Sequence, residues 1–330
     1  MKFRIDRRNF AVLTGAALAA PLVLLAQPAK RVYRVATLDD TVESAREHLW
    51  RIFRDRLRKL VLAEGNDVAY ETRTARGDTE RLPALAAELV ALKPDIVVCA
   101  GSSAASAAMK ATSSIPIVFV GSGDPIAAGL VASLARPGGN VTGTANVLSE
   151  IIGKQLELLR AVAPAATRIV YLSDASNKAV SATYRELEAN ARTLKLTIRL
   201  LDGRKRTELE RSFETIKRER MQALMVGASG TLLEHRDQIV QFAAREKLPV
   251  VYARREYVDS GGLFSYSADY QWLYQRGADF AHRILSGARP ADLPVERSSN
   301  LRMVLNLKTA HTLGIKIPES VRLRVDEVLE

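Results

Sequence analysis

Short apolar runs alternate with amphipathic segments along the chain, and this alternation indicates an α/β fold. The runs at 96–100 and 115–120 are almost wholly apolar, which is typical of strands buried on both faces of a parallel sheet. The segment 43–64 spaces Leu49, Phe53 and Leu57 four positions apart, as on one face of a helix. The predicted strands are 34–38, 68–71, 96–100, 115–120, 168–172, 197–201, 223–226, 250–253, 263–266 and 303–306. The predicted helices are 43–64, a helix capped by Asp78, 103–111, 179–194, 207–220, 233–246, 269–285 and 308–313.

The second half of the chain repeats the plan of the first. Residues 95–121 and 222–253 each hold an apolar strand, a Gly/Ser loop, a helix, a proline and a second apolar strand. Two similar lobes with polar loops at matching places predict a cleft between them.

The segment 115–143 predicts one wall of that cleft. A strand is followed by the polar loop 121–124, and Asp124 and Pro125 are suited to the cap and first position of a helix. Ligands of open α/β sheets bind beyond the carboxyl ends of the strands, beside helix N-termini.

Polar residues that follow the predicted strands are the candidate ligand contacts. Small hydroxyls at helix starts suit a carboxylate, an aspartate suits an amine, and an arginine suits a carboxylate. Each residue alone could equally be a helix cap or a turn former. The predicted ligand-binding residues are Ser102, Ser103, Ser122, Asp124, Asp174, Asn177, Ser229 and Arg254, with Tyr252 or Tyr266 as an aromatic wall. The neighbouring Arg255 and Glu256 are expected to form an internal ion pair.

Composition narrows the class of protein. The chain has 330 residues, of which 47% are hydrophobic and 26% charged, and this is enough for two domains of about 150 residues each. The one cysteine, Cys99, excludes an intrachain disulfide, argues against a cysteine-based metal site and is expected to be a buried hydrophobe.

Catalytic signatures are missing from the sequence. It holds no dinucleotide-binding glycine motif after a strand, no phosphate-binding loop and no nucleophile turn. The four histidines fall on predicted helices without metal-ligand spacing. The basic helix 43–64 could be a nucleic-acid or lipid patch, but its interleaved acidic residues favour a solvated face. We therefore expect no enzyme activity, no metal, no cofactor and no nucleic-acid partner.

The first 26 residues have the pattern of an export signal. A basic start precedes the apolar run 10–25, and Ala26 ends a cleavage sequence before Gln27. Arg7 and Arg8 resemble a twin-arginine signal, and the pattern leaves open Sec or twin-arginine export and cleavage or retention as an anchor. A periplasmic protein with no membrane span in its mature part is predicted.

Several segments together resemble a known family. They are 7–10, 82–89, IPIVFVGSGDPIAAGLVASLARPGGNVTG at 115–143, 156–169, 235–266 and 291–318. The chain resembles the ABC transporter substrate-binding proteins of the periplasmic-binding protein type I fold, in the branch of tryptophan and related amino-acid binders. The resemblance implies two Rossmann-like lobes, with parallel sheets flanked by helices and joined by three crossover strands, that close on a ligand. The chain departs from the family at 229–231 and at Arg254, where a more acidic ligand is one hypothesis.

The resemblance also implies a discontinuous domain organisation. We expect an export signal at 1–26, an N-terminal lobe at 32–145 plus about 268–288, and a C-terminal lobe at 146–267 plus about 289–330. The expected function is that of an extracytoplasmic monomer that captures a small polar ligand, an amino acid or related carboxylate, and delivers it to an ABC permease and its ATPase. The alternatives are a periplasmic sensor that signals to a membrane receptor and an enzyme that uses Asp124 or Asp174 as a base.

Overall fold

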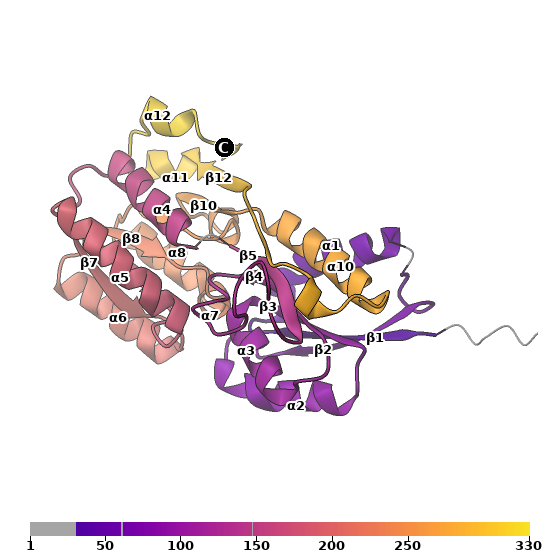
Figure 1. The fold of residues 1–330 in the computed structure, drawn as a ribbon. Helices are drawn as coiled ribbons and strands as arrows, with labels where there is room; N and C mark the ends of the chain where they lie inside the picture. The colour runs from indigo at the N-terminus through magenta and orange to yellow at the C-terminus, as the bar shows by residue number, and fades with distance from the viewer. Residues whose placement is uncertain (1–30, 61, 147) are drawn as a thin grey trace, which may run out of the picture. The chain divides into compact units, whose positions relative to one another are not determined.

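Two mostly parallel β-sheets flanked by helices build the described part of the chain (Figure 1). The computed structural model describes residues 31–60, 62–146 and 148–330, so the expected export signal at 1–26 lies outside the described residues. The strands are β1 (Tyr33–Asp39), β2 (Val68–Thr74), β3 (Ile96–Ala100), β4 (Ile117–Ser122), β5 (Val141–Ala145), β6 (Arg168–Ser173), β7 (Thr197–Asp202), β8 (Ala223–Val226), β9 (Val250–Tyr252), β10 (Phe264–Ala268), β11 (Glu296–Arg297), β12 (Leu301–Asn306) and β13 (Glu327–Leu329).

The helices alternate with these strands. They are α1 (Glu43–Lys59), α2 (Leu82–Ala91), α3 (Gly101–Ala111), α4 (Leu148–Val162), α5 (Lys178–Thr193), α6 (Arg206–Arg218), α7 (Gly230–Glu234), α8 (Arg236–Arg245), α9 (Glu256–Asp259), α10 (Tyr270–Leu285), α11 (Leu307–Thr312) and α12 (Glu319–Arg322), with 3₁₀ turns η1 (Thr79–Arg81) and η2 (Pro290–Asp292). The first sheet has the order β11-β5-β4-β3-β1-β2 and the second β13-β12-β10-β9-β8-β6-β7. We call the first sheet with its helices the N-lobe and the second with its helices the C-lobe. The predicted α/β class is confirmed.

Alternate residues of the N-lobe strands face opposite helical layers. On β3, Val98 lies in one buried cluster with Phe53 of α1 and Phe280 of α10. Its neighbour Cys99 lies in another cluster with Leu85 of α2 and with residues of α3. Cys99 is fully buried, as expected, and burial raises the pKa of its thiol. The apolar runs therefore read as central strands covered on both sides.

The C-lobe repeats this arrangement. On β6, Tyr171 packs in a cluster with Leu159 of α4 and Leu187 of α5. The next residue, Leu172, packs in the cluster that contains Phe213 of α6 and residues of α8. Figure 1 shows α5 and α6 beside the C-lobe sheet and α1 beside α10 in the N-lobe.

The chain passes between the sheets after β5, after β10 and after β11. Helix α10 packs against α1, β4 and β5, so it returns to the N-lobe. Strand β11 also pairs with β5 of the N-lobe, through Glu296 opposite Thr144, although the expected division gave 289–330 to the C-lobe. The residue boundaries of the lobes stay a prediction, and this pairing moves the last one beyond residue 297.

The expected helix at Pro125 is wrong. The carboxylate of Asp124 does accept hydrogen bonds from the N–H groups of Ile126 and Ala127, each at 3.0 Å. The segment then forms only turns, because Leu130 N–H bonds to the carbonyl of Pro125 at 2.8 Å and Gly129 adopts a φ of +71°. A cap stabilises only the first turn, and it does not by itself propagate a helix through a glycine in the left-handed region. The expected helix 233–246 is divided into α7 and α8, and β5 and α4 were not predicted.

Candidate functional site

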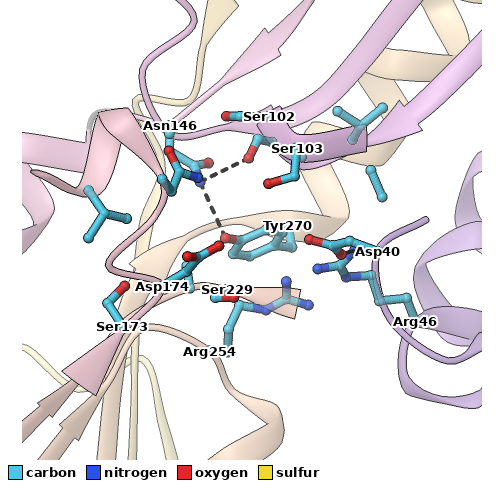
Figure 2. A pocket seen from close by; sticks show the side chains of 18 of the residues that line it. Asp40, Arg46, Ser102, Ser103, Asn146, Ser173, Asp174, Ser229, Arg254 and Tyr270 are labelled. Atoms are coloured by element: carbon cyan, nitrogen blue, oxygen red, sulfur yellow. Dashed lines mark hydrogen bonds and ion pairs between the residues drawn. The ribbon is translucent and has the colours of Figure 1, made fainter. Parts of the chain in front are cut away.

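A cavity of about 80 Å³ lies between the two lobes, beyond the carboxyl ends of their strands (Figure 2). This volume is several times what one water molecule needs. The N-lobe contributes Asp40, Arg46, Ala100, Gly101, Ser102, Ser103, Val120, Gly121, Gly123 and Tyr274. The C-lobe contributes Tyr171, Ser173, Asp174, Asn177, Val180, Ala228, Ser229 and Arg254, and the crossovers contribute Asn146 and Tyr270.

The start of α3 forms one polar wall of the cavity. Gly101 turns the chain from β3 into the helix with a φ of +80°, and Ser102 and Ser103 follow in the first turn. The Oγ atoms of Ser102 and Ser122 lie 2.8 Å apart. The N-cap residue of this eleven-residue helix is Ala100, whose side chain makes no hydrogen bond to the first N–H groups. The backbone N–H groups of this first turn and the hydroxyls of Ser102 and Ser103 suit a carboxylate.

A buried charge cluster stands beside this wall. Arg46 Nη1 lies 2.6 Å from Asp39 Oδ1 and 2.7 Å from Asp40 Oδ1. Asp39 also accepts a hydrogen bond from the indole N–H of Trp50 at 2.8 Å. Burial works to lower the pKa of Arg46, but the two carboxylates outweigh it and raise that pKa well above its usual value. Burial raises the pKa of Asp39, the carboxyl on the inner side of the cluster, and Asp40 is the carboxylate that lines the cavity.

Arg254 occupies the opposite wall, and its charge is already paired. Its Nη2 lies 2.5 Å from Glu256 Oε1, and its Nε donates to Glu256 Oε2 at 3.2 Å. The Cζ atom stands 3.8 Å from the ring centroid of Tyr270, so the guanidinium stacks on that ring (Figure 2). The expected ion pair between Arg255 and Glu256 is therefore wrong. Arg255 instead binds Glu327, at 2.6 and 2.8 Å, because adjacent residues of a helical turn do not face each other.

The crossovers form the base of the cavity. Asn146 follows β5 and donates from Nδ2 to the hydroxyl of Tyr270 at 3.2 Å. Its Oδ1 is buried and has no hydrogen-bond partner among the described residues. A side chain at Gly121 would meet Tyr270 Cε1 at 3.3 Å, so the ring lies directly against β4. The amide of Asn146 and the hydroxyl of Tyr270 thus lie where the two lobes connect.

Asp174 is the acidic group of the C-lobe wall. Its Oδ1 accepts hydrogen bonds from Ser176 N and Oγ at 3.0 and 2.6 Å, and Arg204 Nε lies 3.4 Å away. Burial raises the pKa of Asp174, although the bonds from Ser176 and the charge of Arg204 oppose that change.

Six of the ten predicted contact residues line the cavity, namely Ser102, Ser103, Asp174, Asn177, Ser229 and Arg254. The other four lie outside the lining. Ser122 is buried behind Ser102, and Asp124 caps the turn described above. Tyr252 is buried with its ring stacked on Tyr257 at 4.8 Å, and Tyr266 packs between the clusters of both lobes. Contact with a ligand stays a prediction for all ten.

The lining also contains residues that were not predicted, chiefly Asp40, Arg46, Asn146, Tyr171, Tyr270 and Tyr274. Asp40 follows the first predicted strand, so the rule that selected Ser102 would also have selected it. Tyr270 opens α10 after β10 and follows the same rule. Arg46 and Tyr274 lie within helices and carry no such signal.

The described residues lack two further features. No group of three or more histidine, cysteine, aspartate or glutamate side chains in this part of the chain is arranged to bind a metal ion. Within the same residues, no helix has the length and apolar character needed to cross a membrane.

Comparisons with known proteins give consistent results. A family model described as ABC transporter substrate binding protein matches residues 42–329. A tyrosine-binding protein of Clostridioides difficile is 26% identical over 253 residues, which are 77% of this chain and 72% of that protein. A crystal structure of an ABC domain in complex with L-Trp from Streptococcus pneumonia has a TM-score of 0.83 and 27% identity, covering 91% of this chain and all of that one. A conserved domain protein from Vibrio cholerae has a TM-score of 0.84 and 26% identity, covering 90% of this chain and all of that one.

Proposed function

Because this chain belongs to the ABC transporter substrate-binding protein family, we propose that it captures an amino acid in the cavity between its lobes and delivers it to a permease. The observation that carries the proposal is a polar cavity at the junction of two α/β lobes in a chain matched by the family model over 42–329. A ligand that contacts both lobes stabilises their closed arrangement by its better contacts there.

The charges around the cavity suit the two ends of an amino acid. The first turn of α3, with Ser102 and Ser103, offers N–H and O–H donors to a carboxylate. The carboxylate of Asp40, on the same wall, suits an ammonium group. Strands β1 and β3 are neighbours in the sheet, so both groups lie at one edge and within reach of one ligand. The zwitterionic head group would therefore bind to the N-lobe.

Aromatic side chains near this head-group position support an aromatic amino acid. Tyr171, Tyr270 and Tyr274 line the cavity together with Val120 and Val180. Aromatic and apolar faces with a few polar groups are typical of sites for small apolar side chains. The tyrosine-binding relative and the L-Trp complex support the same class.

An acidic ligand side chain has less support than the sequence suggested. It would need an unpaired cation in the lining, whereas Arg254 is paired with Glu256 and Arg46 with Asp39 and Asp40. Breaking a buried pair to bind a ligand would leave one of these carboxylates uncompensated. A neutral zwitterion avoids that cost.

The wider context of the proposal is transport outside the cytoplasm. The pattern of residues 1–26 supports export to the periplasm with cleavage after Ala26, and the N-terminal sequence of the exported protein tests this. The transporter family favours delivery to a permease over signalling to a receptor. Recovery of the bound amino acid unchanged after prolonged incubation distinguishes a binder from an enzyme that uses Asp174.

Titration calorimetry on the chain from Gln27 tests the ligand class. L-tryptophan, L-tyrosine and L-phenylalanine are compared with L-glutamate, and tryptamine and indole-3-propionate test the need for each charged end. We expect the aromatic amino acids to bind, and each analogue that lacks one charge to bind at least tenfold more weakly. Tight binding of L-glutamate, or binding of either analogue as tight as that of L-tryptophan, would contradict the proposed class.

Variants of the lining test the site itself. Asp40→Asn and Ser102→Ala should each weaken binding of the preferred amino acid by about tenfold or more, because each removes a hydrogen bond or charge contact to the ligand. Asp124→Asn is the matched control, since it lies outside the lining and asparagine also caps the turn. Unchanged affinity in the first two variants would place the ligand elsewhere.

A further inference from the structure

The two lobes also touch away from the crossovers, where α7 of the C-lobe meets the start of α1 in the N-lobe. Glu234, the last residue of α7, accepts hydrogen bonds at Oε2 from Thr41 Oγ1 at 3.2 Å and from Val42 N–H at 3.3 Å. Val42 is the N-cap residue of α1, and no side chain of its own caps the helix. Glu234 thus supplies, from the other lobe, the acceptor and the negative charge that a helix start favours.

Apolar contacts also join α7 to the start of α1. Ala45, in the first turn of α1, belongs to the same buried cluster as Leu232 and Leu233 of α7. Val42 packs against that cluster as well. The start of an N-lobe helix is therefore buried in a C-lobe core, and separating the lobes at this place would expose apolar surface.

Gly230, the first residue of α7, makes the close approach possible. A Cβ atom at this position would lie 2.0 Å from Asp40 Oδ1 and 2.5 Å from Asp40 Cγ. Asp40 cannot retreat without leaving Arg46, to which it is paired at 2.7 Å. The backbone of Gly230 does not adopt a positive φ, so the need for glycine comes from the neighbouring lobe and not from local conformation.

We propose that α7 stabilises the closed arrangement of the two lobes. Glu234 acts as a positioning residue through its hydrogen bonds to the start of α1, and Gly230 leaves room for the side chain of Asp40. We call this contact of α7 with the N-lobe the clasp. Asp40 lines the cavity and also abuts Gly230, so one carboxylate faces both the ligand position and the closing contact. Ligand binding is coupled to closure through this carboxylate, a link that rests on the proposed function. The clasp itself does not depend on which ligand binds.

Chemical trapping of the closed form tests the clasp without a ligand. Lys205 Nζ of the C-lobe lies 2.6 Å from Glu80 Oε1 of the N-lobe, and both side chains are at least half exposed. Cysteines at these two positions can be joined by a short bis-maleimide only when the lobes are together. The native Cys99 is fully buried and does not compete. The rate of linkage measures the closed population even where that population is small.

We expect Gly230→Ala and Glu234→Ala to slow the linkage by about tenfold, because one introduces an overlap and the other removes two hydrogen bonds to a charged acceptor. Glu234→Gln keeps an acceptor oxygen and should restore part of the rate. Gly153→Ala is the matched control, since a Cβ there meets nothing within 4 Å and its rate should equal that of the parent.

Each outcome bears on one proposal. An unchanged rate in both Gly230→Ala and Glu234→Ala, with native circular dichroism, would overturn the clasp. If one of these variants fails to fold, the other together with Glu234→Gln still decides the matter. Slower linkage in a protein that binds neither L-tryptophan nor L-tyrosine would leave the clasp standing and refute the proposed ligand class.

Discussion

At the scale of single residues, Arg254 shows how a buried cation can shape a site through its neighbours. Its charge is paired with Glu256, and its planar group stacks on Tyr270, whose hydroxyl accepts a hydrogen bond from Asn146. These contacts connect the C-lobe to two of the three crossovers, those after β5 and after β10. Arg254 therefore fixes the orientation of the Tyr270 ring at the base of the cavity, and its substitution should disturb the site through that ring.

The Arg254–Glu256 pair makes stability depend on acid pH. Burial works to raise the pKa of Glu256, but the charge and hydrogen bonds of Arg254 outweigh it and lower that pKa from 4.5 to about 2. A carboxyl whose pKa falls on folding stabilises the protein above its unfolded pKa, and that contribution is lost as the pH falls from about 4.5 towards 2. We expect a loss of about 3 kcal/mol in unfolding free energy from this group across that window.

Urea unfolding at pH 7, 4 and 3 measures this dependence. Glu256→Gln should flatten the curve below pH 4.5, although it lowers stability at pH 7 because Arg254 loses its charged partner. Glu80→Gln is the control, because Glu80 is exposed and its pair with Lys205 is screened by solvent. An equally steep acid loss in Glu256→Gln would show that other carboxyls govern it.

At the scale of elements, α10 connects the core of the N-lobe to the cavity. It follows the crossover from β10, and its first residue is Tyr270. Asp269 caps the helix by accepting a hydrogen bond from Trp272 N–H at 3.1 Å. Gly277 brings α10 close to β4, since a Cβ there would lie 2.6 Å from Val120 Cγ2. The helix is thus seated on the strand whose end, at Gly121, lines the cavity.

Gly277→Ala should destabilise the protein by about 1–3 kcal/mol, because the added methyl group overlaps a stiff, buried valine. Denaturant unfolding at pH 7 measures the change. The control Gly153→Ala lies in α4 with open space around it and should stabilise by about 0.5–1 kcal/mol, the usual gain in a helix. A midpoint for Gly277→Ala at or above that of the parent would contradict the close packing.

At the scale of the whole molecule, the two lobes are tied together by the crossovers and by α7. Ala45 of the N-lobe is buried in a C-lobe cluster, and Ile151 of α4 in an N-lobe cluster. Shared clusters make it costly for one lobe to unfold alone.

We expect calorimetric unfolding of residues 27–330 to give one transition, raised by L-tryptophan or whichever aromatic amino acid binds. A ligand that binds only the folded protein adds RT ln(1 + [L]/Kd), about 2.7 kcal/mol at a hundredfold excess over Kd. L-alanine at the same concentration serves as the control and should leave the midpoint unchanged. Two separate transitions would show that the lobes unfold independently.

Most of the fold follows from the sequence because helix and strand periods are local properties of the chain. The solid run at Val97 and Val98 and the spacing of Leu49 and Phe53 predicted the layers that the structure has. The position of Ser102 and Asp174 after strands predicted their place in the cavity, since parallel strands end at one edge. The cap at Asp124 predicted a helix that did not form, because a cap is only one local contribution to the stability of a helix.

The tertiary structure alone decided which side chains contact one another across distant segments. The local sequence does not decide whether Glu256 pairs with Arg254 or with Arg255. Nothing in it stacks Arg254 on Tyr270 or brings Gly230 against Asp40, because these contacts depend on how separate segments pack. The same holds for Arg46 and Tyr274, which lie within helices whose orientation brings them to the cavity. The sequence by itself determined the elements and their polar ends, through periods of two and of 3.6 residues. Packing between distant segments determined which of those ends form one site.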